Sequence, residues 1–147
     1  MLSRKEADMT EFPTTVHHVG LTVTDPEVSR QWYQQLLNAA PVLDEEVPAA
    51  PERHQGFRKV VFVLPGGLVL GLVAHPATDR NRRFDEFVPG LDHLSFGCAG
   101  RSELEKWQNR LDELGITHGS IAEDAVGFAL PFRDPDNIAL EFFAPRS

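Results

Sequence analysis

Two histidines and one glutamate in this sequence, His18, His93 and Glu141, have side chains that bind divalent metal ions. Imidazole and carboxylate groups suit Fe, Mn, Zn, Ni and Cu, and two histidines with one carboxylate leave coordination positions open for a substrate or oxygen. The three residues are 75 and 48 positions apart, so no short-spaced motif joins them. A single histidine in a strand is more often a hydrogen-bonded structural residue. The metal hypothesis therefore depends on whether these residues occupy related positions.

An internal repeat relates them. An offset of 75 residues lays His18 on His93, and it also matches two further pairs, Trp32 with Trp107 and Leu36 with Leu111. In the last strands of the two copies, Leu70 laid on Leu140 places Gly71 on Glu141. Such a repeat predicts two similar modules. It also isolates Gly71, because glycine in a strand often marks a close approach by a ligand or another backbone.

Each copy has the pattern of a strand, a helix and two or three further strands. In the first helix, Asp25-Pro26 supplies an N-cap and an N1 proline; in the second, residues 102–105 form a capping box and Gly115 ends the helix. Residues 44–61 should hold another strand, around residues 58–62 or earlier, and residues 62–65 match residues 128–131. We expect one α+β domain over residues 14–145, made of modules 14–78 and 90–145. Residues 1–13 are expected to be a flexible leader.

Alternation in the first strand of each copy predicts which face carries the histidine. His18 shares its face with Gly20 and Thr22, whereas bulky apolar residues point the other way, and the second copy has the same pattern around His93. Glu141 lies opposite its apolar neighbours in the same manner. We therefore expect a helix-covered core on one side of each sheet and a cavity on the other.

Composition excludes several classes of function. The net charge of −8 argues against nucleic acid as a partner, and no apolar run is long enough to cross a membrane. The single Cys98 cannot form an internal disulfide, so we expect a cytoplasmic protein. Two segments are expected to form loops over a cavity: the proline-rich residues 47–53 and the basic residues 79–83, which could attract a small anion unless they are simply solvated.

Three segments, residues 18–23 followed by Asp25, residues 91–96 and residues 132–143, resemble the glyoxalase, bleomycin-resistance and extradiol-dioxygenase superfamily, also called vicinal oxygen chelate proteins. The resemblance covers about residues 14–145 and implies paired βαβββ modules around a shared cavity. It also implies a divalent ion held by His18, His93 and Glu141, with a fourth place that falls on Gly71. Glyoxalase I-like members have a carboxylate at that place and methylmalonyl-CoA epimerases an amide, so glycine argues against both activities.

The resemblance leaves several activities open. A His, His, Glu site implies dioxygenase, lyase or thiol-transferase-like chemistry on a small oxygen-rich molecule, with Glu141 and His75 as candidate catalytic groups. Gly71 and His75 are expected to line the substrate cavity, although His75 lies about 13 Å along the strand from Gly71. The alternative is a metal-free protein that binds or sequesters a small molecule, as bleomycin-resistance proteins do. Modules can pair within one chain or between two, and a homodimer is expected.

Overall fold

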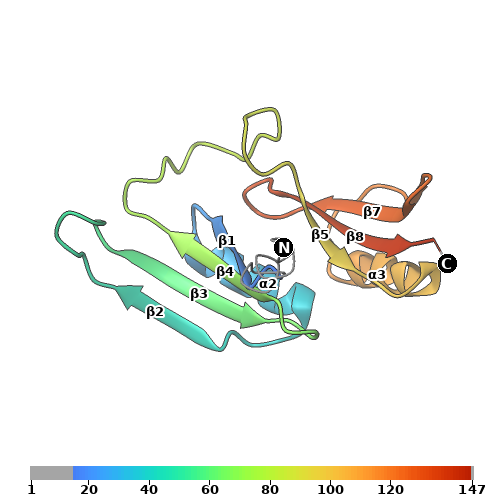
Figure 1. Ribbon diagram of the computed structural model, residues 1–147, viewed down its shortest axis with the longest axis horizontal. Helices are drawn as coiled ribbons and strands as arrows, with labels where there is room; N and C mark the ends of the chain where they lie inside the picture. Colours follow the sequence, from blue (N-terminus) through green and yellow to red (C-terminus); the bar gives the residue numbers. More distant parts are fainter. Residues whose placement is uncertain (1–14, 147) are drawn as a thin grey trace, which may run out of the picture.

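The computed structural model describes residues 15–146, and the predicted leader, residues 1–13, lies outside this range. Two four-stranded mixed sheets, each with one helix, make up the structure (Figure 1). The first module contains β1 (His18–Thr22), α2 (Pro26–Leu37), β2 (Leu43–Val47), β3 (Phe57–Val63) and β4 (Val69–Ala74). The second contains β5 (Leu94–Gly97), α3 (Arg101–Glu113), β6 (Ala122–Glu123), β7 (Gly127–Arg133) and β8 (Ala139–Pro145). This architecture confirms the predicted fold of two βαβββ modules.

The two sheets have the same topology. The strand orders are β1-β4-β3-β2 and β5-β8-β7-β6, and in each sheet the first strand runs parallel to the last. Gly20 pairs with Gly71 in the first sheet, and Ser95 pairs with Glu141 in the second. The offset between Gly20 and Ser95 is again 75, so the registers place Gly71 and Glu141 at equivalent positions, as the sequence repeat indicates.

One of the strand matches made from sequence is wrong. Phe62 of β3 pairs with Leu70, and its counterpart opposite Leu140 is Phe132, four residues beyond the predicted Phe128. The strand β7 continues through Pro131 as far as Arg133. The carbonyl of Pro131 accepts a hydrogen bond from Gly119 N, so it points away from β8, and the backbone nitrogen of Pro131 points the same way. Proline is tolerated here because β8 needs no N–H donor from this residue.

The helix ends follow the sequence signals in part. Asp25 caps α2 by accepting hydrogen bonds from the backbone N–H groups of Glu27 and Val28, and Gly115 ends α3 with a φ of 68°. The predicted capping box in residues 102–105 is wrong, because the N-cap of α3 is Gly100, two residues before the predicted Ser102. The Glu103 carboxylate accepts the N–H of Ala99 instead, at 2.6 Å.

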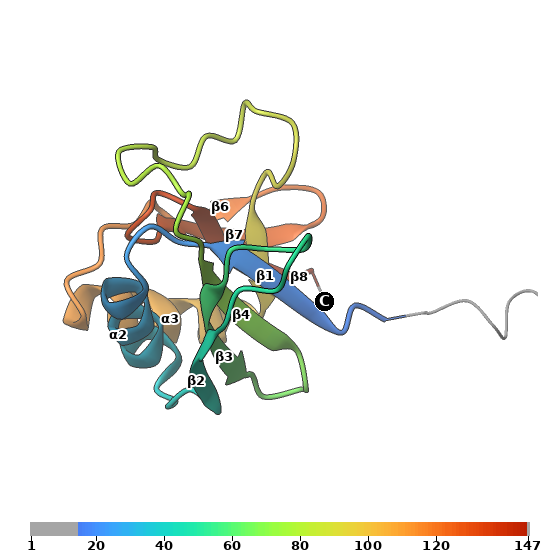
Figure 2. The ribbon, with the colours of Figure 1, turned by 90° about the vertical axis from the view of Figure 1, so that its left-hand side faces the viewer.

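One hydrophobic core is shared by both modules. The helices lie side by side on the same side of the molecule (Figure 2), where the Arg110 side chain donates a hydrogen bond to Gln35 O. Trp107 stacks on Phe142 at 4.3 Å between ring centroids, and Trp32 of the first module contacts Phe132 of the second at 6.2 Å. The matched tryptophans therefore pack the core rather than bind a ligand. None of the described helices is both long and apolar enough to cross a bilayer.

Two buried carboxylates join the modules. Asp134 accepts a hydrogen bond from Tyr33 Oη at 2.8 Å, and Asp136 accepts two from Thr24, one from its backbone N–H and one from its hydroxyl. Asp134 also accepts the backbone N–H groups of Asp136 and Ile138, as a turn-forming residue does. Burial raises the pKa of Asp134 to about 6, although the hydrogen bonds it accepts oppose this shift.

This raised pKa predicts a pH-dependent stability. The folded state holds a proton on Asp134 that the unfolded chain, with an ordinary aspartate pKa, releases at lower pH. The stabilisation that comes from this proton is complete at pH values below the pKa of Asp134 in the unfolded chain. It is lost as the pH rises through about 6, the pKa of Asp134 in the folded protein. The unfolding free energy of the wild-type protein should therefore fall, relative to that of Asp134→Asn, by about 2 kcal/mol between about pH 4 and about pH 7.

Denaturant titrations at several pH values measure this difference. The exposed Glu46, converted to glutamine, is the control, and its profile should follow that of the wild-type protein. Parallel profiles for wild type and Asp134→Asn would show that Asp134 titrates normally.

Candidate functional site

The candidate residues lie on the uncovered face of each sheet. In β1, Leu21 and the following Val23 are buried on the helix side, whereas His18, Gly20 and Thr22 are exposed. The second sheet repeats this arrangement, with Phe96 buried and both His93 and Ser95 exposed. The alternation predicted from sequence is correct. The faces that carry the histidines and Glu141 are therefore open to a ligand or to another surface.

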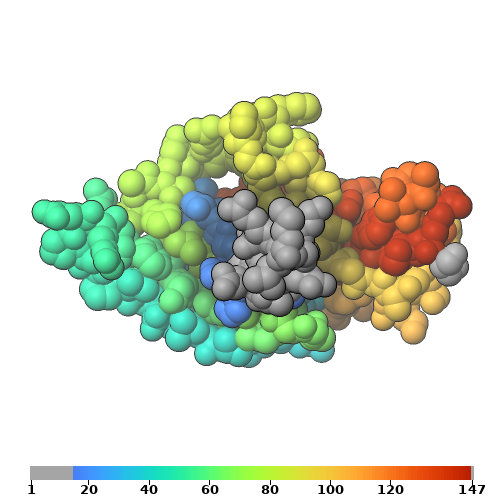
Figure 3. Space-filling view, viewed as in Figure 1, coloured from blue at the N-terminus to red at the C-terminus, as the bar shows by residue number. Residues whose placement is uncertain are grey.

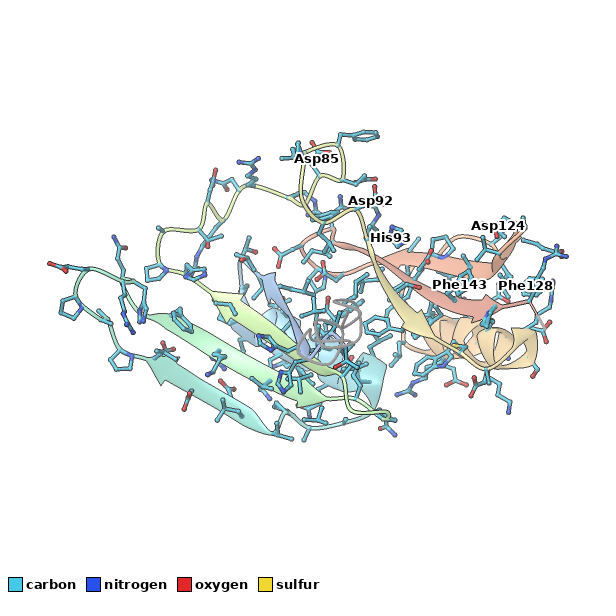
Figure 4. All side chains as sticks on the ribbon, viewed as in Figure 1. Asp85, Asp92, His93, Asp124, Phe128 and Phe143 are labelled. Atoms are coloured by element: carbon cyan, nitrogen blue, oxygen red, sulfur yellow. The ribbon has the colours of Figure 1, made fainter. Side chains whose placement is uncertain are left out.

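His93 and Glu141 meet on the second sheet. His93 immediately precedes β5, and its Nε2 lies 3.5 Å from Glu141 Oε1. Its other nitrogen, Nδ1, is 2.6 Å from Asp92 Oδ1, so the carboxylate accepts the Nδ1 proton and fixes the ring (Figure 4). This hydrogen bond raises the pKa of His93, with a smaller contribution from Glu141. His93 is 47% exposed and Glu141 21%, so both remain accessible.

These two side chains have the geometry of a ligand pair. Metal-binding histidines commonly donate their second ring N–H to a carboxylate, as His93 does to Asp92. Two ligand atoms each about 2.1 Å from an ion of tetrahedral geometry lie about 3.4 Å apart. The observed separation of 3.5 Å is close to that value. The donors present therefore fit a divalent ion.

A pocket of about 470 Å³ surrounds this pair, and charged residues line its rim. Arg133 pairs with Ala139 in the sheet, and the neighbouring Pro131 pairs with Glu141, so Arg133 lies on the same face as Glu141. Its guanidinium holds Glu86 of the linker between the modules through two hydrogen bonds of 2.7 and 3.1 Å. Figure 3 shows this linker, residues 79–92, as an arch above the sheets. Sequence reasoning missed Arg133 because it ended the strand β7 too early.

His118 also lines this pocket, and no role was expected for it from sequence. Its Nδ1 lies 2.7 Å from Gly119 O, and its Nε2 lies 2.7 Å from Asp112 Oδ1. Because both partners are acceptors, both ring nitrogens donate, and the hydrogen bonds to Gly119 and Asp112 raise the pKa of His118. His118 thus ties α3 to the chain segment beside β7 at the pocket wall.

His18 does not join the pair within one chain. It lies on the first sheet, and its Nδ1 is 2.8 Å from Nδ1 of His17, whose ring turns toward it because His17 precedes β1. Across residues 15–146, no three histidine, cysteine, aspartate or glutamate side chains are close enough together to hold one ion. A single chain therefore presents two of the three expected ligands.

Comparison with known proteins gives the family of the chain. Residues 15–142 match the family model of the Glyoxalase/Bleomycin resistance protein/Dioxygenase superfamily. The chain belongs to this superfamily. A search of curated proteins found no match.

Solved structures of the same superfamily share the fold. A glyoxylase/bleomycin resistance protein/dioxygenase domain from Frankia sp. EAN1pec is 36% identical, with a TM-score of 0.72 over 92% of this chain and 100% of that one. The fosfomycin resistance protein FosX from Listeria monocytogenes, in a complex with Mn(II) and 1S,2S-dihydroxypropylphosphonic acid, is 18% identical, with a TM-score of 0.64 over 92% and 95%. A glyoxalase family protein from Enterococcus faecalis is 21% identical, with a TM-score of 0.67 over 88% and 97%.

Gly71 occupies in β4 the position that Glu141 occupies in β8, and the backbone at this position does not require a glycine. Its φ is not positive, and a Cβ built there would meet only Val19 O at 3.8 Å and Gly20 Cα at 4.0 Å, which are ordinary contacts. The glycine therefore leaves open space next to Gly20 on the uncovered face.

His75 and Cys98 lie apart from the pair. His75 follows the end of β4, in a pocket that contains neither His93 nor Glu141. A catalytic role for His75 therefore remains a prediction, and its place in a different pocket from His93 and Glu141 lends it no support. Cys98 is buried, and burial raises the pKa of its thiol, so it is not an activated nucleophile.

The contact between Arg133 and Glu86 predicts a change in the linker. Arg133 holds the pKa of Glu86 down at about 2, so the carboxylate is charged and bound at neutral pH. Glu86→Gln removes the charge that Arg133 binds, and the backbone amides of residues 85–91 should then exchange with deuterium several times faster.

Hydrogen–deuterium exchange with mass spectrometry measures this effect. Glu123→Gln is the matched control, because it removes a different exposed ion pair, with Arg146, and should leave the linker unchanged. Identical exchange in Glu86→Gln and wild type would mean that the Phe84 backbone contacts hold the linker without Arg133.

Proposed function

We propose that this superfamily member is a divalent-metal-dependent enzyme whose ligands are His18, His93 and Glu141. The observation that carries the proposal is the pairing of His93 Nε2 with Glu141 Oε1 at 3.5 Å, with the opposite ring nitrogen fixed by Asp92. Fe, Mn, Zn and Ni all suit such donors. FosX, which shares the fold, was crystallised with Mn(II) and a small dihydroxy phosphonate. A small oxygen-rich molecule is the substrate class that we propose here.

The third ligand is proposed to come from a second copy of the chain. His18 lies on a face of the first sheet that exposes apolar side chains, such as Val63 at 47% and Leu43 at 37%, beside the polar Thr22 and Glu45. Burying this face against the open face of a partner's second sheet would remove apolar surface from water. The two faces carry their candidate ligands at equivalent register positions, so a twofold homodimer can bring His18 to the His93 and Glu141 of its partner.

The side chains around the pair have separable roles in this proposal. When bound, a divalent ion supplies Lewis acidity that stabilises negative charge developing on a substrate oxygen. Asp92 orients the ring of His93 and keeps the proton on Nδ1, which leaves the lone pair of Nε2 free to bind the ion. Gly71 leaves the fourth side unblocked. Arg133 and His118 line the same pocket and offer N–H donors that a substrate oxygen can approach. Dioxygenase, lyase and thiol-transferase-like reactions all fit these roles.

Metal content tests the proposal. The protein should bind about one divalent ion per chain after incubation with Fe(II), Mn(II), Zn(II) or Ni(II) and removal of the excess. His93→Gln and Glu141→Gln should each reduce the bound metal at least about tenfold. Elemental analysis by mass spectrometry measures it.

The matched control is His54→Gln, which removes an imidazole from the β2–β3 loop and should not alter the metal content. Wild-type protein that takes up no metal would contradict the enzyme proposal. The metal-free sequestering protein would then be the better description.

Mixing two inactive variants tests whether the site spans two chains. His18→Ala and Glu141→Ala homodimers should both fail to bind metal, because each lacks a ligand in every site. After subunit exchange, a heterodimer regains one complete site, with His18 from one chain and Glu141 from the other. About a quarter of all sites should then bind metal.

Manganese titrations monitored by electron paramagnetic resonance can count these sites. A mixture of His18→Ala with the double variant His18→Ala/Glu141→Ala is the control and should regain none. No recovery in the first mixture, once mass spectrometry has shown subunit exchange, would contradict a site shared between two chains.

A further inference from the structure

A second pocket, which none of the three candidate metal ligands lines, brings together three features of the sequence. It occupies about 400 Å³ at one end of the first sheet, where β2 and β4 end and β3 begins. The proline-rich loop contributes Val47, Pro48 and Ala49; the end of β4 contributes His75; and the basic segment contributes Arg80. Neither His93 nor Glu141 lines it. The proposed metal chemistry thus leaves this pocket without a role.

Aromatic side chains form one wall of this pocket. Phe57 begins β3 and pairs with Val47, on the uncovered face of the sheet. Its ring centroid is 5.6 Å from that of His75 and 5.0 Å from that of His54. Such a cluster offers flat surfaces against which a planar molecule can pack. In the single chain Phe57 is half-buried and His75 is exposed.

The loop that holds this wall has a defined shape. Gly56 has a φ of 84°, which favours glycine, and a Cβ at this position would lie 2.9 Å from Val47 O. The loop is also closed by backbone hydrogen bonds between Ala50 and His54. The β2–β3 loop therefore folds closely onto itself beside Phe57, and the pocket is a fixed feature of the chain.

Arg80 gives the pocket an available positive charge. Arg58 also lines the pocket, but Asp44 and Glu27 neutralise it through hydrogen bonds of 2.9 to 3.1 Å. None of the ion pairs among residues 15–146 involves Arg80. Glu46, the one carboxylate in the lining, pairs with Arg58 across β2 and β3 and shares its face of the sheet.

We infer that this pocket binds a planar organic anion, of the aromatic carboxylate class. The ring of such a ligand packs against Phe57 and His75, and its carboxylate pairs with the Arg80 guanidinium, which presents two parallel N–H donors to it. Each part of the ligand meets a matching part of the pocket: a flat apolar wall and an unpaired cation. The inference holds whether or not the chain binds a metal.

Benzoate is the probe for this site. Titrated into isotopically labelled protein, it should shift the amide resonances of residues 55–58 and 74–80, whereas those of residues 92–95 and 139–142 should not move. Arg80→Gln should weaken benzoate binding about tenfold, the size expected for a charge-assisted hydrogen bond. Benzamide, which has the same shape without the charge, should bind wild-type protein about tenfold more weakly than benzoate.

Arg82→Gln is the matched control. It removes the same charge from the same loop, but Arg82 lines a different pocket, so benzoate affinity should not change. Equal weakening by Arg80→Gln and Arg82→Gln would show general attraction by the loop and overturn the site. Equal affinity for benzoate and benzamide, or no shifts at residues 55–58, would also overturn it. Because these residues are exposed, both variants should fold, and the unaffected resonances report this.

Discussion

Parallel pairing between the first and last strands of each module is the interaction on which the rest of the structure depends. It places β1 beside β4 and β5 beside β8, so residues far apart in sequence become neighbours across a sheet. His93 and Glu141 meet only because β5 and β8 pair in this register. A shift by one residue would turn one of the two side chains into the core. The same register in the first sheet leaves Gly71 next to Gly20, with no side chain at either position.

The asymmetric covering of the sheets decides where function can reside. Each helix buries one face of its sheet, and the two helices share a single core that includes the matched tryptophans. The opposite faces carry small, polar and some apolar residues together with the candidate metal ligands, and are not covered by a helix. The buried carboxylates Asp134 and Asp136 fix the modules relative to each other at the expense of desolvation, which is why the pKa of Asp134 is raised. They hold the modules in an arrangement in which His18 remains apart from His93 and Glu141.

Several features of the site could be predicted from sequence because they follow from local periodicity. Alternation in β1 and β5 correctly separated the histidine faces from the core, and the repeat correctly matched Gly71 with Glu141. The match of Phe62 with Phe128 was wrong. The residues before Pro65 and Pro131 are similar, but a turn follows Pro65, whereas β7 continues through Pro131. That error hid Arg133, whose side chain shares the face of Glu141. His118 was missed because its two hydrogen bonds come from a helix end and a loop, which no periodic pattern specifies.

The sequence by itself determined the superfamily, the two modules, the helix-covered faces and the identity of the candidate ligands. These depend on residue type and on periods of two and about four residues, which are local properties of the chain. Tertiary structure alone decided that Asp92 orients His93, that Arg133 binds the linker, and that His18 stays separate within one chain. It also gathered Phe57, His75 and Arg80 into one pocket. These are contacts between loops and strand ends, and their geometry is set by how the sheets and linker pack rather than by any spacing in the sequence.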